Sequence, residues 1–238
     1  MNILSDRLTF FVGVNTGFVT GGLPDERYIE FYRARSSARL SCAIVGNVVV
    51  PGGHGSNDYS TVIDGNPIWG KVAAAIRMKG SLPGIQLATT WPGYIGSRKF
   101  LSSHPHEIID QARLLVQSLC EADVERIIDA FTAGAALAVE HGFGHVQVHA
   151  AHGYLPSLLM DDRISLQAKQ ARHGFRAFAE WLRSREIQSS IRFSLKTGDN
   201  TFDASGSELF QDTVIARPFD FIDLSSGFYN IDKRLIYL

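Results

Sequence analysis

The chain has 238 residues, of which 45% are hydrophobic and 20% charged, and its formal net charge is −1. This length and composition favour one globular domain over residues 1–238. The balanced charge, without a basic cluster, argues against binding to nucleic acid or to a membrane surface. No apolar run reaches the roughly 18 residues that a membrane span needs. The N-terminus has no signal-peptide core, and Cys42 and Cys120 are far apart, so we expect a reduced, cytoplasmic protein.

Short apolar segments alternate with amphipathic ones along the chain. Strands are expected at residues 8–14, 41–50, 85–88, 146–149, 191–195 and 221–224. Helices are expected from residue 24 onward and at 68–76, 124–138, 171–183 and 208–216, with one helical patch inside the mixed segment 91–121. This alternation predicts an α/β protein with parallel strands, either a barrel or a doubly wound open sheet. Periodicity alone does not choose between the two.

The run from Val146 to Tyr154 is the most informative part of the sequence. An apolar strand leads into His149, His152, a glycine and Tyr154. Sites in parallel α/β folds lie at the carboxyl ends of strands, where two imidazoles and a phenol could bind a carbonyl group and deliver a proton. Core packing is the next alternative. A zinc site ranks below both, because no third ligand lies nearby and neither cysteine has a metal-binding spacing.

Two further polar residues interrupt apolar strands. Gln86 lies within residues 85–88 and Arg192 within residues 191–195. A guanidinium inside a strand is costly without an anionic or electron-rich partner. Two interpretations of Arg192 therefore have equal weight. Arg192 either binds a ligand, or it has a structural role in an ion pair or at a strand edge that the prediction places one residue off. The residues that follow this strand could also line a site: Lys196, Thr197 and Asp199.

The run from Phe131 to Leu155 resembles the signature of the Old Yellow Enzyme family, a helix ending in a Gly-Phe pair followed by the fourth barrel strand. Weaker similarities occur in the same order elsewhere in the chain, at Asp6–Leu8, Ile44–Asn47, Ile85–Ala88, Arg192 and Asp223–Gly227. The resemblance therefore favours the barrel: a TIM (β/α)8 barrel, of which about six of the eight strands are evident in this chain.

The resemblance also implies cofactors, namely FMN, with NADH or NADPH as reductant. Gln86 would bind the pyrimidine side of the flavin ring, and Arg192 would lie beside its N1–C2 edge and stabilise negative charge. Asn47 and Val14 match positions near the flavin. However, the family usually has a Thr or Cys that tunes the flavin at the end of strand one, and Val12–Val14 offer no hydrogen-bonding side chain there.

For the substrate, the resemblance implies that His149 and His152 bind the carbonyl oxygen of an α,β-unsaturated compound. Tyr154 would then protonate its α-carbon while hydride reaches the β-carbon. The residues Thr89–Pro92 replace the family's His-Ala-Gly run, and only Asp162-Arg163 remains of the loop that usually follows the tyrosine. These changes predict a specialised small-molecule substrate, of the kind found in secondary metabolism.

The sequence stops at Leu238, soon after the sixth expected strand, where family members continue through two strands whose loops bind the flavin phosphate. A barrel without them has unpaired edges. The chain is therefore expected to be incomplete, to be completed by a partner or a second copy, or to close differently. The leading hypothesis is an FMN-dependent ene-reductase. The alternatives are a flavin-free isomerase or cyclase that uses the same His149, His152 and Tyr154, and a non-catalytic subunit.

Overall fold

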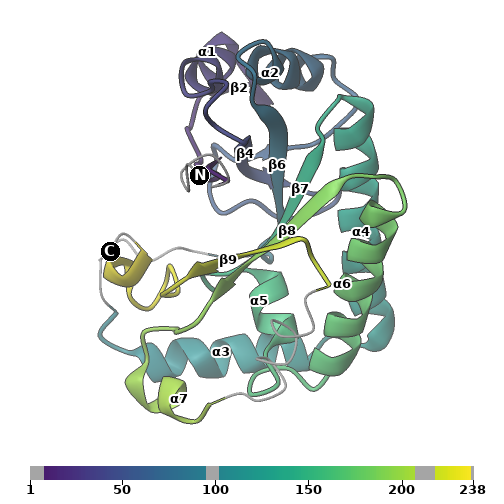
Figure 1. Cartoon of the computed structure of the whole chain (residues 1–238). Helices are drawn as coiled ribbons and strands as arrows, with labels where there is room; N and C mark the ends of the chain where they lie inside the picture. Colours follow the sequence, from purple (N-terminus) through teal and green to yellow (C-terminus); the bar gives the residue numbers. More distant parts are fainter. Residues whose placement is uncertain (1–7, 95–101, 207–217, 237–238) are drawn as a thin grey trace, which may run out of the picture.

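A computed structural model of the chain describes residues 8–94, 102–206 and 218–236. Its parallel strands lie in the spatial order β1 (Phe10–Phe11), β4 (Cys42–Val49), β6 (Leu82–Ala88), β7 (His145–Ala150), β8 (Gln188–Ser194) and β9 (Phe221–Ser225). The short β5 (Thr61–Val62) also pairs with β4, and β2 (Val19–Thr20) pairs with β3 (Leu23–Pro24) in a separate hairpin. The sheet is curved, and helices lie on its outer side (Figure 1).

The helices are α1 (Glu26–Ala34), α2 (Ile68–Arg77), α3 (Pro105–Gln117), α4 (Glu121–Glu140), α5 (Leu155–Met160), α6 (Ala168–Arg183), α7 (Asn200–Ala204) and the 3-10 helix η1 (Lys233–Ile236). The expected βα alternation and parallel sheet are thus confirmed, and α5 and α7 are additional. The helix expected at residues 208–216 lies outside the described residues. No helix in the described part of the chain combines the length and hydrophobicity needed to cross a membrane.

The first strand is shorter than expected, since only Phe10 and Phe11 pair with β4. The following residues, from Val12 to Asn15, line a cavity instead. The buried Tyr32 of α1 donates a hydrogen bond from its hydroxyl to the carbonyl of Val14 at 3.0 Å, which holds this segment against the helix. The prediction of a strand over residues 8–14 was therefore wrong outside Phe10–Phe11.

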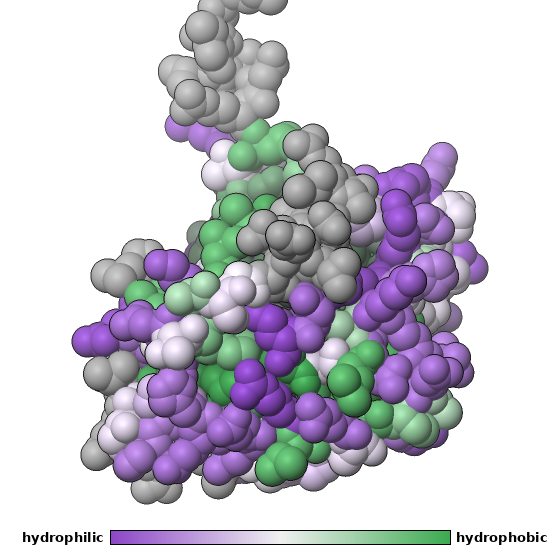
Figure 2. All heavy atoms as spheres, turned by 90° about the horizontal axis from the view of Figure 1, so that it is seen from below, coloured by the Kyte–Doolittle hydropathy of each residue, from purple (hydrophilic) through white to green (hydrophobic). Residues whose placement is uncertain are grey.

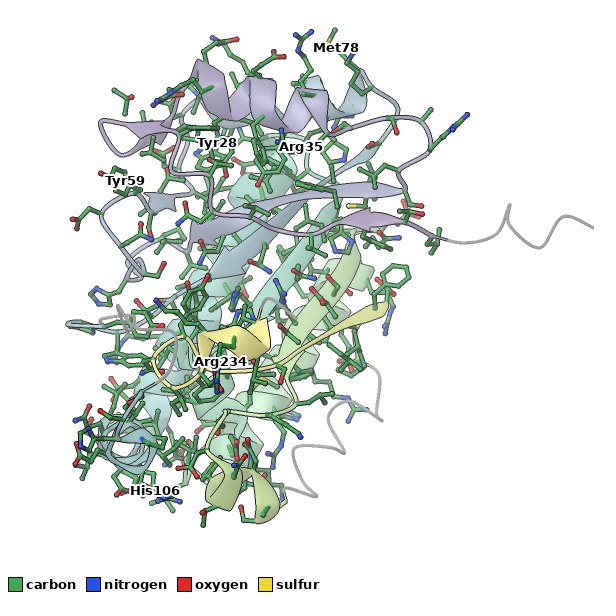
Figure 3. The ribbon with its side chains drawn as sticks, turned by 90° about the vertical axis from the view of Figure 1, so that its left-hand side faces the viewer. Tyr28, Arg35, Tyr59, Met78, His106 and Arg234 are labelled. Atoms are coloured by element: carbon green, nitrogen blue, oxygen red, sulfur yellow. The ribbon has the colours of Figure 1, made fainter. Side chains whose placement is uncertain are left out.

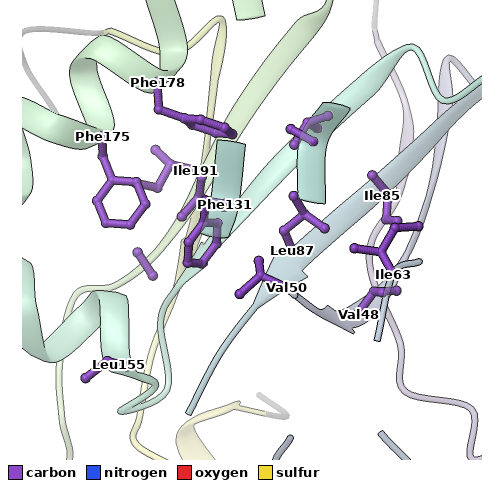
Figure 4. Close-up of a cluster of buried hydrophobic side chains, with 14 of the residues drawn as sticks. Val48, Val50, Ile63, Ile85, Leu87, Phe131, Leu155, Phe175, Phe178 and Ile191 are labelled. Carbon is purple, nitrogen blue, oxygen red and sulfur yellow. The ribbon is translucent and has the colours of Figure 1, made fainter. Parts of the chain in front are cut away.

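Residues of each central strand alternate between two faces of the sheet. The outer face of β7 and β8 is apolar, with Val146, Val148, Ile191 and Phe193 all buried. Phe131 of α4 and Phe175 and Phe178 of α6 pack over this face, with the rings of Phe131 and Phe175 5.3 Å apart (Figure 4). The opposite residues of these strands are polar, so the inner face of the sheet is suited to binding.

The curvature brings the two edge strands together at their N-terminal ends. The rings of Phe10 in β1 and Phe221 in β9 make an edge contact with centroids 5.1 Å apart. The ring of His145, the first residue of β7, lies 5.8 Å from that of Phe10. The sheet therefore encloses an interior, as in a barrel, although no hydrogen-bonded ladder joins β1 to β9 among the described residues.

The face of the molecule that carries α3 and α7 is mostly hydrophilic (Figures 1 and 2). A view from another side shows η1, which contains Arg234, between α1 and α3 (Figure 3). In this view α1 is marked by Tyr28 and by Arg35, the residue after its end, and α3 is marked by His106. Lys233 and Ile236 of η1 line the same cavity as the residues after β1. The 3-10 helix therefore forms part of the wall above the strand ends.

We predict that His145 makes the protein less stable in acid. Its ring is fully buried, with Nδ1 2.9 Å from Gln188 Oε1 and Nε2 2.8 Å from Ser190 Oγ. Burial lowers the pKa of His145 to about 4. The unfolded chain binds a proton near pH 6.5 and the folded chain only near pH 4. The contribution of His145 to stability should therefore be fully present above pH 6.5 and fall by about 3 kcal/mol toward pH 4.

Denaturant unfolding at several pH values between 7 and 4 measures this effect. In a His145→Gln variant the loss of stability between pH 7 and pH 4 should be about 3 kcal/mol smaller than in the wild type. His173→Gln is the control, because His173 is exposed and its replacement should leave the loss of stability unchanged. Equal pH dependence of the wild type and the His145→Gln variant would show that His145 does not carry the effect.

Candidate active site

A cavity of about 530 Å³ lies at the carboxyl ends of the parallel strands. It is lined by Val12, Gly13, Val14, Asn15, Asn47, Ser56, Asn57, Gln86, Tyr94, His149, His152, Tyr154, Arg192, Tyr229, Lys233 and Ile236. This set includes every residue for which the sequence predicts a catalytic or cofactor-binding role. The volume lies within the range of small-molecule and cofactor sites, about 300–1,000 Å³.

The strand register explains why distant residues meet here. Gln86 of β6 is opposite Gln147 of β7, and His149 of β7 is opposite Arg192 of β8. Because the strands are parallel and in register, side chains of the same parity point to the same face. Asn47 comes from β4, while His152 and Tyr154 lie in the turn that follows β7.

Arg192 has an anionic partner in the next strand. Asp223 of β9 is its direct neighbour in the register, and Arg192 Nε lies 3.4 Å from Asp223 Oδ2. Arg192 also donates a hydrogen bond from NH2 to Ser225 Oγ at 3.2 Å. Burial raises the pKa of Asp223, against the opposing effects of Arg192 and Gln147. The two interpretations of Arg192 are thus compatible, because it forms an ion pair and also lines the cavity.

A second interaction joins β6 to the same carboxylate. Gln86 donates a hydrogen bond from Nε2 to Gln147 Oε1 at 2.6 Å, and Gln147 Nε2 donates to Asp223 Oδ2 at 3.4 Å. Gln86 also packs closely against two glycines. A Cβ added at Gly46 would lie 2.7 Å from Gln86 Cβ, and one added at Gly13 would lie 3.1 Å from Gln86 Oε1. Glycine at these positions thus leaves space for the glutamine.

The two histidines are buried and uncharged near neutral pH. Burial is the main cause that lowers the pKa of His152, to about 3, with a smaller contribution from Arg192. Burial, His152 and Arg192 together lower the pKa of His149 well below its ordinary value. His152 Nδ1 lies 3.3 Å from His149 Nε2. A neutral imidazole can donate one hydrogen bond and accept another, so the pair can bind a carbonyl oxygen without adding a charge.

Tyr154 is positioned by contacts on both sides. Its ring stacks on His149 with centroids 4.2 Å apart, and Tyr94 packs edge-on against it at 5.7 Å. Asn47 donates a hydrogen bond from Nδ2 to the Tyr154 hydroxyl at 2.8 Å. The phenol is therefore held next to the histidine pair, in a geometry suited to proton transfer.

Several functional candidates were not predicted from the sequence. Gln147, Asp223 and Ser225 form the hydrogen-bonding network beneath the cavity, and Tyr94 and Tyr229 line its wall. The alternation of polar residues at positions 145, 147 and 149 of β7 could have indicated Gln147. The aromatic pair lies in loops, where no periodic pattern identifies it.

The residues after β8 are placed differently from what was expected. Lys196, Thr197 and Asp199 do not line the cavity. Thr197 donates hydrogen bonds to Asp203, and the side chain of Asp199 accepts hydrogen bonds from the first backbone amides of α7. Thr197 therefore stabilises the loop, and Asp199 caps the helix. In the described part of the chain, no group of three or more His, Cys, Asp or Glu side chains could hold a metal ion.

The cavity residues fit a planar heterocycle with carbonyl groups, such as a flavin ring. Asn47 Oδ1 and the Tyr94 hydroxyl, both in the cavity lining, are buried and have no hydrogen-bond partner among the described residues. Buried polar atoms of this kind normally have partners, so a polar ligand is expected to supply them. Gly13 adds no side chain where Gln86 approaches the cavity. Val14 offers a backbone carbonyl, which already accepts a hydrogen bond from Tyr32.

Comparison with known proteins gives consistent results. The family model described as NADH:flavin oxidoreductase / NADH oxidase family matches residues 16–169. An NADPH dehydrogenase of Geobacillus thermodenitrificans is 31% identical over an alignment that covers 52% of this chain and 37% of the dehydrogenase. The NADH-dependent flavin oxidoreductase nadA of Aspergillus parasiticus is 24% identical over 87% of this chain and 52% of its own. The chain therefore spans about half or less of the length of these relatives.

A solved structure supports the fold. The Old Yellow Enzyme homologue from Zymomonas mobilis superposes with a TM-score of 0.64 at 17% identity, over 91% of this chain and 68% of the homologue. Since the identity is low, this similarity concerns the fold alone. It confirms the prediction of TIM-barrel architecture.

Proposed function

Because the chain belongs to the NADH:flavin oxidoreductase / NADH oxidase family, we propose that it takes part in FMN-dependent oxidoreduction with NADH or NADPH as reductant. We propose further that the substrate is a small α,β-unsaturated carbonyl compound. The observation that carries this proposal is the grouping of two neutral histidines and one tyrosine beside a guanidinium in a single cavity. FMN, when bound, would supply the hydride chemistry that no side chain can perform.

Gln86 and Arg192 are proposed to hold the polar edge of the cofactor. The Gln86 amide is fixed by Gln147, and the Arg192 guanidinium by Asp223 and Ser225, so both groups are oriented before binding. A positive charge at this place stabilises negative charge on a bound ring. Asn47 Oδ1, buried without a partner among the described residues, is a further acceptor for the ligand.

His149 and His152 are proposed to bind the substrate's carbonyl oxygen, and Tyr154 to protonate its α-carbon. The lowered pKa values keep both imidazoles neutral, so they polarise the carbonyl by hydrogen bonding rather than by protonating it. Tyr154 is stacked on His149 and therefore lies next to any group that the histidine binds. The unusual residues Val12–Val14 and Thr89–Pro92 support a specialised substrate, and we propose a role in secondary metabolism.

A visible absorption spectrum of the purified protein, recorded before and after adding excess FMN, tests the proposal. We expect a flavin band equivalent to about one FMN per chain, since the cavity can hold one flavin ring. Intact mass measured on the same sample establishes which chain is present. A protein of the expected mass that does not bind FMN would contradict the proposal and favour acid–base chemistry without net redox, as in an isomerase or cyclase.

A further inference from the structure

Ser225 is the one hydroxyl in the described structure that bridges the cavity's arginine and its histidine pair. Ser225 Oγ lies 3.2 Å from Arg192 NH2 and 2.7 Å from His152 Nε2. It belongs to β9, far from the histidines in the sequence, and it was not predicted as a site residue. Nothing in the chemistry proposed above requires it to contact the substrate.

The direction of the hydrogen bonds around Ser225 follows from the arginine. A guanidinium has only donors, so Ser225 Oγ must accept from Arg192. The hydroxyl then has its own proton to donate, and His152 Nε2 is its close partner at 2.7 Å. If Nε2 carried a proton instead, the serine oxygen would accept twice and its hydroxyl proton would be left without this acceptor. Satisfying each buried group therefore favours an unprotonated Nε2.

The tautomer of His152 determines which group faces the site. A neutral imidazole with no proton at Nε2 carries it at Nδ1. His152 Nδ1 lies 3.3 Å from His149 Nε2, so this N–H points toward the place where the two imidazoles converge. We propose that Ser225, oriented by Arg192, is a positioning residue that fixes His152 as the Nδ1–H tautomer, so that this N–H is donated to His149 Nε2 and the protonation pattern of the whole imidazole pair is set.

The backbone of His152 is also held in place, which makes the tautomer the remaining variable. His152 has a positive φ of 61°, a left-handed conformation that is unusual for a non-glycine residue. Its N–H donates to Ser194 Oγ at 2.8 Å, and its carbonyl accepts from the amide of Tyr229 at 3.1 Å. The backbone position is thus set by contacts that do not involve Ser225, and the ring packs edge-on against Tyr229 with centroids 5.8 Å apart. Removal of the Ser225 hydroxyl should therefore chiefly affect the ring proton.

The test is the ¹⁵N NMR spectrum of the histidine rings in protein labelled at histidine, with a His152→Asn variant for assignment. In the wild type, His152 should show a protonated Nδ1 and an unprotonated Nε2. Ser225→Ala should give a mixture of tautomers, and Ser225→Thr, which keeps the hydroxyl, should restore the wild-type pattern. Ser226→Ala is the matched control, because it removes the neighbouring hydroxyl of the same Ser-Ser pair.

This inference rests on the proposed function only for its catalytic consequence. Ser225→Ala should lower kcat/KM for the unsaturated carbonyl about tenfold, the effect of one hydrogen bond. Because Ser225 also contacts Arg192, FMN titration of the same variant measures any separate effect on the cofactor site. An unaltered His152 spectrum in Ser225→Ala would overturn the inference, whatever the reaction is. An altered spectrum in a protein that binds no FMN would support the tautomer assignment and contradict the proposed function instead.

Discussion

Replacing Tyr154 with Phe should slow oxidation of the reduced enzyme by an unsaturated carbonyl compound by about 10²- to 10⁴-fold, the usual contribution of a positioned general acid. The substitution removes the phenolic proton and the acceptor of the hydrogen bond from Asn47. It keeps the ring that stacks on His149 at 4.2 Å, so the cavity should retain its shape. Stopped-flow measurement of the two half-reactions separately checks the prediction, since reduction of the flavin by NADH or NADPH should keep its wild-type rate.

Tyr59→Phe is the matched control, because the Tyr59 side chain is exposed and lies outside the cavity lining (Figure 3). Both half-reactions should be unchanged in this variant. Equal slowing of both half-reactions in Tyr154→Phe would assign the tyrosine a role in cofactor binding or stability. An unchanged oxidative half-reaction would show that another group protonates the substrate.

The fold could be predicted from the sequence because its elements have strong local signals. The strand β4 is a run rich in Val and Ile, β7 alternates valines with polar residues, and the helices that follow them have regular apolar spacing. The choice of a barrel over an open sheet came from the family resemblance, since both architectures have the same alternation. The two short helices α5 and α7, of 6 and 5 residues, are too short to show helical periodicity and were not predicted.

The site could be predicted in part for a related reason. Gln86, His149 and Arg192 stand out as polar residues inside apolar strands. Asp223 does not stand out, because an aspartate near a strand end is common, and its importance depends on the register that places it opposite Arg192. Contacts of this kind depend on which residues of neighbouring strands are paired, and a single sequence does not contain that information.

The early end of β1 shows a different limit. The run from residue 8 to residue 14 has the composition of a strand, but the contact between Val14 and Tyr32 and the cavity beside it are tertiary effects. Tertiary contacts override local strand preference at such places. They also explain why Val12–Val14, which differ from the family pattern, still line the cavity.

Replacing Arg192 with Leu should destabilise the fold and weaken FMN binding together. The substitution leaves Asp223 with only Gln147 as a polar partner in the network, inside a site where burial already raises its pKa. Removing one partner of a buried ion pair lowers the free energy of unfolding by about 3–5 kcal/mol. Because the Arg192 and Asp223 side chains are 16% and 22% exposed, we expect a smaller loss of about 2–3 kcal/mol. Denaturant unfolding and FMN titration measure the two effects.

The pH dependence and a second substitution separate the two roles of Arg192. A carboxyl group whose pKa is higher in the folded than in the unfolded protein stabilises the fold at low pH, and this stabilisation is lost as the pH rises through the folded pKa. Because the pKa of Asp223 is raised in this way, the Arg192→Leu variant should be closer to wild-type stability in acid than at neutral pH. Adding Asp223→Asn should restore stability at neutral pH, because the amide needs no counter-ion. If the double variant regains stability but not FMN affinity, the guanidinium itself holds the cofactor. If it regains both, Arg192 acts only by neutralising Asp223, and its proposed cofactor contact is wrong.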